Sequence, residues 1–163
     1  MIVPPHGFAE ICEYYSLPSR DEAGHVTVAW QAANLVLIPS PFPLTLAWAP
    51  HQVVSHIRCH KKIVEPLTAA LRAVKDAGLA EYLGKDYGGC FVDRAIRGHP
   101  ERMSTHSFGI ALDFAVLKNP MGEPADPIMA HQVAPIFKAL NWTWGGDFRD
   151  RLDSEHFQLA SGY

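Results

Sequence analysis

The chain has 163 residues, of which 48% are hydrophobic and 19% charged, and its formal net charge at pH 7 is -3. These values are ordinary for a globular protein, and the length predicts a single domain over residues 1–163 with a sizeable core. The slightly acidic balance provides no overall basic field, so nucleic acid is not an expected partner. We expect a monomer.

The start of the chain and the cysteines indicate where the protein is made. Residues 1–7 have neither a basic start nor an apolar run, so they do not form a secretory signal. No stretch approaches the roughly 20 apolar residues of a membrane span. Cys12, Cys59 and Cys90 are an odd number without paired spacing. This pattern argues against a disulfide framework and predicts synthesis in the cytoplasm.

In chain order, residues 7–17 predict a short helix and residues 17–24 a loop. Residues 25–38 begin with alternating apolar side chains and end in an apolar run, which indicates either two strands or a strand and a turn. Four prolines between positions 39 and 50 favour extended chain there.

Residues 51–78 predict a helix, because apolar side chains from Ile63 to Val74 recur at spacings of three and four. Gly78 is a natural stop, and Pro66 either starts the main helix or kinks a longer one. His56 and His60 have i, i+4 spacing, which we interpret as helix surface rather than a metal pair.

The second half contains more strand signals. We predict a strand over 87–97, a proline-rich loop over 119–127, a helix over 127–140 and a last strand over 156–159. Helices segregated from a small antiparallel sheet define an α+β class.

Two short motifs concentrate metal-binding side chains. In the first, Gly109 allows a turn between His106 and Asp113, since glycine accepts backbone angles that other residues resist. Apolar residues alternate with Asp113, which places its carboxylate on the strand face opposite them. His156 supplies a second imidazole about forty residues later. Three protein ligands with one open position are typical of catalytic zinc.

These motifs, S-x-H-x-x-G-x-A-x-D and a late D-x-x-H, resemble those of the D-Ala-D-Ala carboxypeptidase (VanY-type) and L-alanyl-D-glutamate endolysin family of zinc peptidases. This family is part of a wider group that includes lysostaphin and hedgehog domains. Segments 88–98 and 142–148 also resemble the family, in the same order, so the resemblance covers about residues 86–158. It implies a hedgehog/DD-peptidase-like fold in which the small sheet carries Zn²⁺ bound by His106, Asp113 and His156.

A carboxylate near the zinc would serve as the catalytic base. Asp153 and Glu155 both flank His156, but Glu155 would point to the opposite face if His156 starts a strand. Asp153 also occupies the D-x-x-H position that matches the family's base. We therefore predict Asp153.

Arginine and serine side chains before the motif are candidates for contacts with substrate. Arg94 or Arg97 could stabilise charge on the scissile carbonyl oxygen, and the resemblance favours Arg94 for this role. Arg97 is then a substrate-binding candidate. Ser104 either bonds substrate backbone or caps the turn.

The predicted function is a zinc metallopeptidase that cuts peptidoglycan stem peptides, either as a D,D-carboxypeptidase or as an L-Ala–D-Glu endopeptidase. The size and the missing signal suggest a phage or prophage lysin, which is made in the cytoplasm and acts on the cell wall. The alternative is a non-catalytic, zinc-containing cell-wall-binding module of the same fold. We also expect Trp142, Trp144 and Phe148 to be buried beside the zinc strand.

Overall fold

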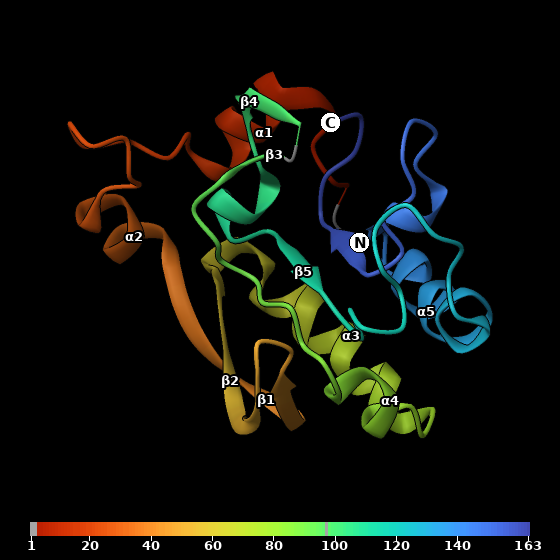
Figure 1. Cartoon of the computed structure of the whole chain (residues 1–163). Helices are drawn as coiled ribbons and strands as arrows, with labels where there is room; N and C mark the ends of the chain where they lie inside the picture. The colour runs from red at the N-terminus through yellow and green to blue at the C-terminus, as the bar shows by residue number, and fades with distance from the viewer. Residues whose placement is uncertain (1–2, 97) are drawn as a thin grey trace.

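The computed structural model describes residues 3–96 and 98–163, which form helices and short antiparallel strands and confirm the α+β class (Figure 1). The helices are α1 (Gly7–Tyr15), α2 (Val28–Asn34), α3 (Val64–Asp76), α4 (Ala80–Gly84) and α5 (Ala134–Ala139). The strands are β1 (Leu35–Leu46), β2 (Ala49–His60), β3 (Ala95–Ile96), β4 (His99–Met103), β5 (Ala111–Asp113), β6 (Thr143–Trp144) and β7 (His156–Gln158). Short 3₁₀ turns occupy Lys61–Ile63, Thr105–Phe108 and Gly145–Asp147.

The N-terminal half contains one long hairpin, β1–β2, and here two predictions were wrong. Residues 28–34 are helical rather than a strand, because the Thr27 side chain accepts a hydrogen bond from the backbone N–H of Trp30 and caps α2. The helix predicted over 51–78 begins only at Val64, because residues 49–60 pair with β1. His56 and His60 therefore lie on a strand.

Prolines interrupt the pairing of β1, which is extended as predicted for this part of the chain. The pairing register shifts between Pro39 and Leu44, where Pro41 and Pro43 cannot donate ladder hydrogen bonds. The strand bends at this irregularity.

α3 and the helical segment that ends in α5 follow their predicted signals. Pro66 lies in the first turn of α3, and Gly78 has φ +75° just beyond its end. A π-helical turn, Met129–Val133, precedes α5, with the N–H of Ala134 donating to the Met129 carbonyl. Pro135 explains this turn, because its ring cannot fit against a regular preceding turn.

The sheet that carries the candidate site has the strand order β5-β7-β6, with every neighbouring pair antiparallel. Leu112 lies opposite Phe157 and Asp113 opposite His156. Leu112 and Phe157 are fully buried, and Phe157 stacks on Phe137 of α5 at a centroid distance of 4.2 Å. One face of the sheet therefore forms core, and the other is left for polar side chains, as the alternation predicts.

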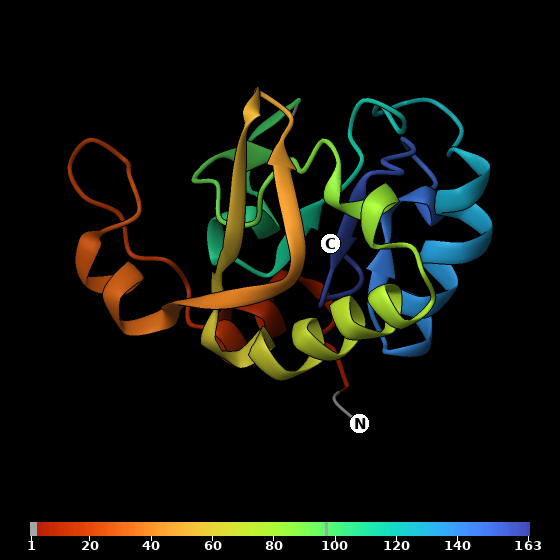
Figure 2. The same cartoon turned by 90° about the horizontal axis from the view of Figure 1, so that it is seen from below.

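Helices flank this arrangement (Figure 2). α3 packs against β1 and α5, while α2 and α5 lie at opposite edges of the molecule. Residues 87–97 were predicted as one strand. Within the described residues 87–96, Ala95–Ile96 pairs with β4, while Tyr87 and Gly89 make isolated bridges to Leu46 and Asp113. No helix in the described ranges is long and apolar enough to cross a membrane.

Candidate metal centre

Three side chains converge on the polar face of the sheet. Nε2 of His106 lies 3.2 Å from Nδ1 of His156 and 3.2 Å from Oδ1 of Asp113, and the last two atoms are 3.0 Å apart. Zinc bonds of about 2.0–2.2 Å in a tetrahedral site separate ligand atoms by about 3.3–3.6 Å. The triangle is slightly tighter than this spacing, so these side chains fit a metal ion of that size.

Local backbone geometry brings the three together. Gly109 adopts the left-handed conformation, φ +69°, and ends the 3₁₀ turn that carries His106. Asp113 closes β5 and pairs directly with His156, the first residue of β7. Gly88 hydrogen-bonds the Asp113 carbonyl, and a Cβ at Gly88 would lie only 2.8 Å from that of Asp113. A side chain at position 88 would therefore displace the carboxylate.

Each imidazole has one nitrogen facing the candidate site and one facing away from it, and the partner of the second nitrogen determines which of the two carries the proton. Nδ1 of His106 lies 2.8 Å from the Cys90 carbonyl oxygen, an acceptor, so this nitrogen carries a proton. Nε2 of His156 lies 3.0 Å from Oε1 of Gln158 and donates to it. Nε2 of His106 and Nδ1 of His156 are then unprotonated and direct their lone pairs towards the Asp113 carboxylate. Three acceptors this close together need a cation or proton between them, which is the setting of a metal site.

Burial and charge act in opposite directions on these groups. Burial raises the pKa of Asp113, but the two imidazoles outweigh it and hold that pKa well below its usual range. Burial lowers the pKa of His156, but the hydrogen bond to Asp113 and the negative charges of Asp113 and Asp153 together outweigh burial and leave the pKa raised. Asp113 is therefore ionised near neutral pH, as a metal ligand must be.

Asp153 lies beside this group on the turn before β7. Its backbone N–H donates to the Gly145 carbonyl, and its own carbonyl accepts from His156. Oδ1 of Asp153 is buried and has no hydrogen-bond partner among the described residues. Burial raises the pKa of Asp153, with nearby His156 opposing the shift. Glu155 is also buried but does not line the cavity that Asp153 enters.

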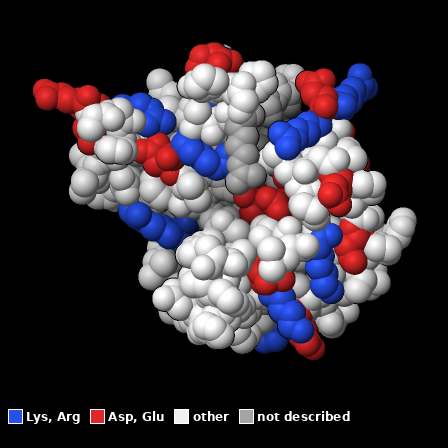
Figure 3. Space-filling view, viewed as in Figure 1, with Lys and Arg blue, Asp and Glu red and all other residues white. Residues whose placement is uncertain are grey.

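A cavity lined by His156, one of the three candidate ligands, and by Asp153 has a volume of about 670 Å³. Figure 3 shows acidic groups in the depression near the middle of this face, with Lys and Arg groups around it. Four arginines line the cavity, and none of them forms an ion pair with a carboxylate in the described part of the chain: Arg94, Arg102, Arg149 and Arg151. Asp147, Asp150 and Asp153 also line the cavity, so the arginines offer anion-binding groups within a lining of mixed charge.

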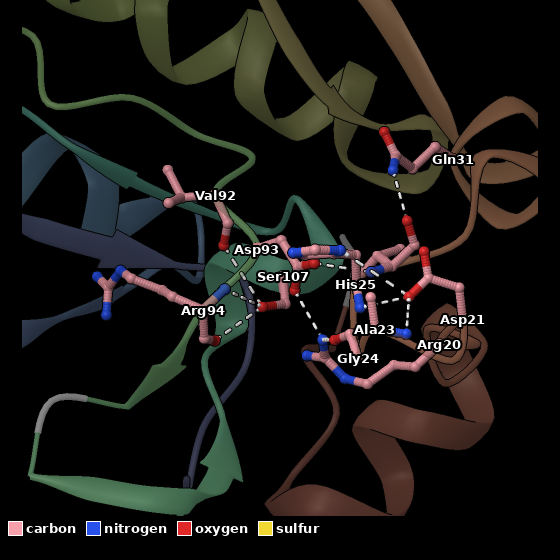
Figure 4. Close-up of polar contacts among 11 residues, drawn as sticks. Arg20, Asp21, Ala23, Gly24, His25, Gln31, Val92, Asp93, Arg94 and Ser107 are labelled. Carbon is pink, nitrogen blue, oxygen red and sulfur yellow. Dashed lines mark hydrogen bonds and ion pairs between the residues drawn. The ribbon is translucent and has the colours of Figure 1, made fainter.

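The backbone of Arg94 is held by hydrogen bonds, and its side chain points away from the group of residues around Arg20 and His25 (Figure 4). The Ser107 hydroxyl accepts from the Arg94 N–H at 3.0 Å and donates to the Arg94 carbonyl at 2.8 Å. The preceding Asp93 pairs with Arg20 at 3.0 Å and accepts from the Val26 N–H. The segment carrying Arg94 is thus fastened on one side to the metal-binding turn and on the other to the loop before α2.

The remaining predicted residues have varied positions. Ser104 caps the 3₁₀ turn, since its hydroxyl accepts from the His106 N–H, and it also lines the cavity. Arg97 lies outside the described residues. Trp142 and Trp144 are buried as expected, but the prediction for Phe148 was wrong, because this ring is half-buried and lines the cavity.

Sequence reasoning missed two residues that support the site. Gln158 bonds His156, and its position two residues along the same strand face was the available signal. Ser107 holds Arg94, but neither its spacing nor its type distinguishes it from an ordinary surface serine.

The fold and the site define a metallopeptidase-like arrangement, a His-Asp-His group on a small antiparallel sheet beside a cavity. Residues 97–159 match the model of a family described as D-alanyl-D-alanine carboxypeptidase. This match confirms the resemblance to VanY-type peptidases and spans His106, Asp113, Asp153 and His156. Comparisons with curated proteins and with solved structures gave no match.

Proposed function

We propose that the protein is a zinc-dependent peptidase that hydrolyses peptidoglycan stem peptides, as a D,D-carboxypeptidase or an L-Ala–D-Glu endopeptidase, and that it serves as a phage or prophage lysin. One observation carries this proposal. Asp153 lines the same cavity as His156, one of the three converging residues, and its buried Oδ1 has no hydrogen-bond partner among the described residues. Burying an unpaired carboxylate oxygen costs free energy. A catalytic base accounts for this cost, whereas a module that only binds the cell wall has no use for such a group.

His106, Asp113 and His156 would hold the zinc. When bound, zinc supplies a Lewis acid that polarises a carbonyl and lowers the pKa of an attacking water. Asp153 takes the proton of that water at its free Oδ1 and then hands it to the leaving amine. Its raised pKa favours the first transfer, because a more basic carboxylate accepts the proton of the water more readily.

Arg94 stabilises the negative charge that develops on the scissile carbonyl oxygen. It lines the cavity and lies close enough to Asp153 to lower the pKa of that carboxyl, although burial dominates. The bonds from Ser107 fix the backbone of Arg94, and its guanidinium donates to the Ala95 carbonyl at 3.4 Å.

The substrate follows from the charge of the cavity. Stem peptides carry several free carboxylates, and the four arginines of the lining form no ion pair with a carboxylate of the described residues, so their guanidinium groups can bind such carboxylates. Ser104 contributes a hydroxyl at the same wall.

The proposal is tested by incubating the protein with defined muropeptides and identifying the products by mass spectrometry. We expect cleavage of one stem-peptide bond, loss of activity with a chelator and recovery on adding zinc. Zinc binding and muropeptide binding without cleavage would instead establish the non-catalytic cell-wall-binding module.

A further inference from the structure

The orientation of the Gln158 side chain is fixed by its neighbours. Its Nε2 lies 3.3 Å from the carbonyl oxygens of Ala160 and Tyr163. Carbonyl oxygens only accept hydrogen bonds, so the amide NH₂ must face them. Oε1 therefore faces the other way, where it lies 3.0 Å from Nε2 of His156 and 2.9 Å from the Thr105 hydroxyl.

This orientation determines the tautomer of His156. Oε1 is an acceptor, so Nε2 of His156 must carry the proton and Nδ1 must present its lone pair to the site. We propose that Gln158 is a positioning residue, which selects this tautomer and so makes Nδ1 of His156 the metal-ligating atom. The inference rests on the proposed function because it takes zinc as the metal, but it does not require that the protein hydrolyses a peptide.

The carbonyl oxygen of Tyr163 is itself held by the N-terminal segment. The N–H of Ser161 donates to the Pro5 carbonyl, and the Ser161 carbonyl accepts from the Gly7 N–H. The Tyr163 ring stacks on Phe8 at 4.9 Å. These contacts, together called the tail clamp, lie outside the family match over 97–159. They link residues 5–8 to a metal ligand through Gln158.

The first test compares Gln158→Met and Gln158→Glu with the wild type, using a zinc titration against a chromophoric chelator. Methionine keeps the length but loses the acceptor, so zinc affinity should fall about 10–100-fold, the usual effect of removing an outer partner of a ligand histidine. Glutamate keeps an acceptor for His156 and should bind zinc more tightly than the methionine variant. Gln52→Met, on an exposed part of β2, is the matched control and should leave the affinity unchanged.

A spectroscopic measurement separates positioning from a general loss of structure. Nitrogen–proton correlation spectra of the zinc-loaded wild type should show His156 protonated at Nε2 and metal-bound at Nδ1. The methionine variant should show a mixed or altered pattern for His156, with His106 unchanged.

The tail clamp is tested without touching Gln158. A Cβ at Gly162 would lie 2.4 Å from the exposed His6 ring, whose Nδ1 lies 3.1 Å from the Ser161 hydroxyl. Gly162→Ala should turn this ring aside, break its bond to the tail and lower zinc affinity several-fold. Gly24→Ala imposes a similar backbone strain, φ +82° against +66°, in open space and should leave the affinity unchanged.

Two outcomes would overturn the inference. One is a methionine variant with wild-type zinc affinity and an unchanged His156 spectrum, and the other is a wild type that binds no zinc, which would also end the proposed function. Zinc binding with the expected variant effects but without hydrolysis of any muropeptide would support the positioning role and refute only the peptidase activity.

Discussion

Asp113 and His156 stand directly opposite each other on β5 and β7, with Oδ1 and Nδ1 of their side chains 3.0 Å apart. Paired strands keep facing side chains in register, so the sheet itself holds two of the three candidate ligands in place. The strand pairing therefore holds the acceptor atoms of Asp113 and His156 close together, as a bound cation requires.

Asp113→Asn should lower zinc affinity by more than about 100-fold, because it removes the one carboxylate among the three candidate ligands while the side chain keeps its size. This loss exceeds the effect of removing a hydrogen-bond partner of a ligand histidine. Competition with a chromophoric chelator measures the loss. Asp76→Asn, at the exposed end of α3, is the control. Unchanged affinity in Asp113→Asn would show that the metal is bound elsewhere.

Trp144→Ala should lower the free energy of unfolding by about 3–5 kcal/mol. The ring is 8% exposed, stacks with Phe157 and donates from Nε1 to the Ser154 carbonyl. Phe148→Ala should cost clearly less stability, since Phe148 is half-buried, and should mainly raise KM because the ring lines the cavity. Urea unfolding and steady-state kinetics measure the two effects, and equal losses of stability would contradict this distinction.

The strand carrying Asp113 could be predicted because its pattern is local. Apolar residues alternate around the aspartate and a glycine precedes them, so neighbours in sequence decide the structure. The partner, His156, could be placed at a strand start for the same reason. Their pairing relied on the family resemblance, since residues 43 positions apart are brought together by tertiary contacts.

The long hairpin could not be predicted from such patterns. The helical spacing that supported the prediction runs only from Ile63 to Val74, where α3 forms. Residues 51–60 lie before it and form a strand because they pair with β1, a tertiary contact that local spacing does not encode. The role of Gln158 was also hidden, because it depends on two backbone carbonyls, of Ala160 and Tyr163, whose positions no spacing encodes.

His60 should make the protein less stable in mild acid. It is fully buried, donates from Nε2 to the Tyr15 carbonyl and accepts from the Lys62 N–H at Nδ1. Burial lowers its pKa to about 4 from the ordinary 6.5, so the unfolded chain binds a proton in this range and the folded chain does not. The stabilisation is complete above pH 6.5 and is lost as the pH falls towards 4, by up to about 3 kcal/mol.

Urea unfolding at several pH values between 7.5 and 4.5 checks this dependence. His60→Gln does not titrate, so its free energy of unfolding should fall less steeply over this window than that of the wild type. Parallel curves for the two proteins would exclude His60 as the cause.

Gly145→Ala should damage catalysis through Asp153. A Cβ at Gly145 would lie 2.3 Å from the Asp153 carbonyl oxygen, so the turn that carries the carboxylate must move. Gly84→Ala creates a similar clash, 2.4 Å from the Pro43 carbonyl oxygen, far from the site along the chain. Both should lose stability, but only Gly145→Ala should lose kcat by tenfold or more, as misplacement of a catalytic group does. Equal kcat values in the two variants would contradict this prediction.

Asp153→Asn decides whether the protein has a catalytic base. The change keeps the size and removes the proton acceptor, so zinc content and fold should stay the same while kcat falls by about 10²–10⁴-fold. The loss should appear in kcat rather than KM, because proton transfer belongs to the transition state. Since burial raises the pKa of Asp153, the acidic limb of the wild-type rate profile should lie above the ordinary carboxylate range.

Glu155→Gln is the control for this experiment, because Glu155 directly precedes His156 but does not line the cavity. It should leave kcat nearly unchanged, and the acidic limb of the pH profile should persist in this variant while it disappears in Asp153→Asn. Reversed results would make Glu155 the base and place its side chain in the cavity in the active form. If neither variant slows hydrolysis, no carboxylate beside His156 accepts the proton, and the peptidase would need a base from another part of the chain.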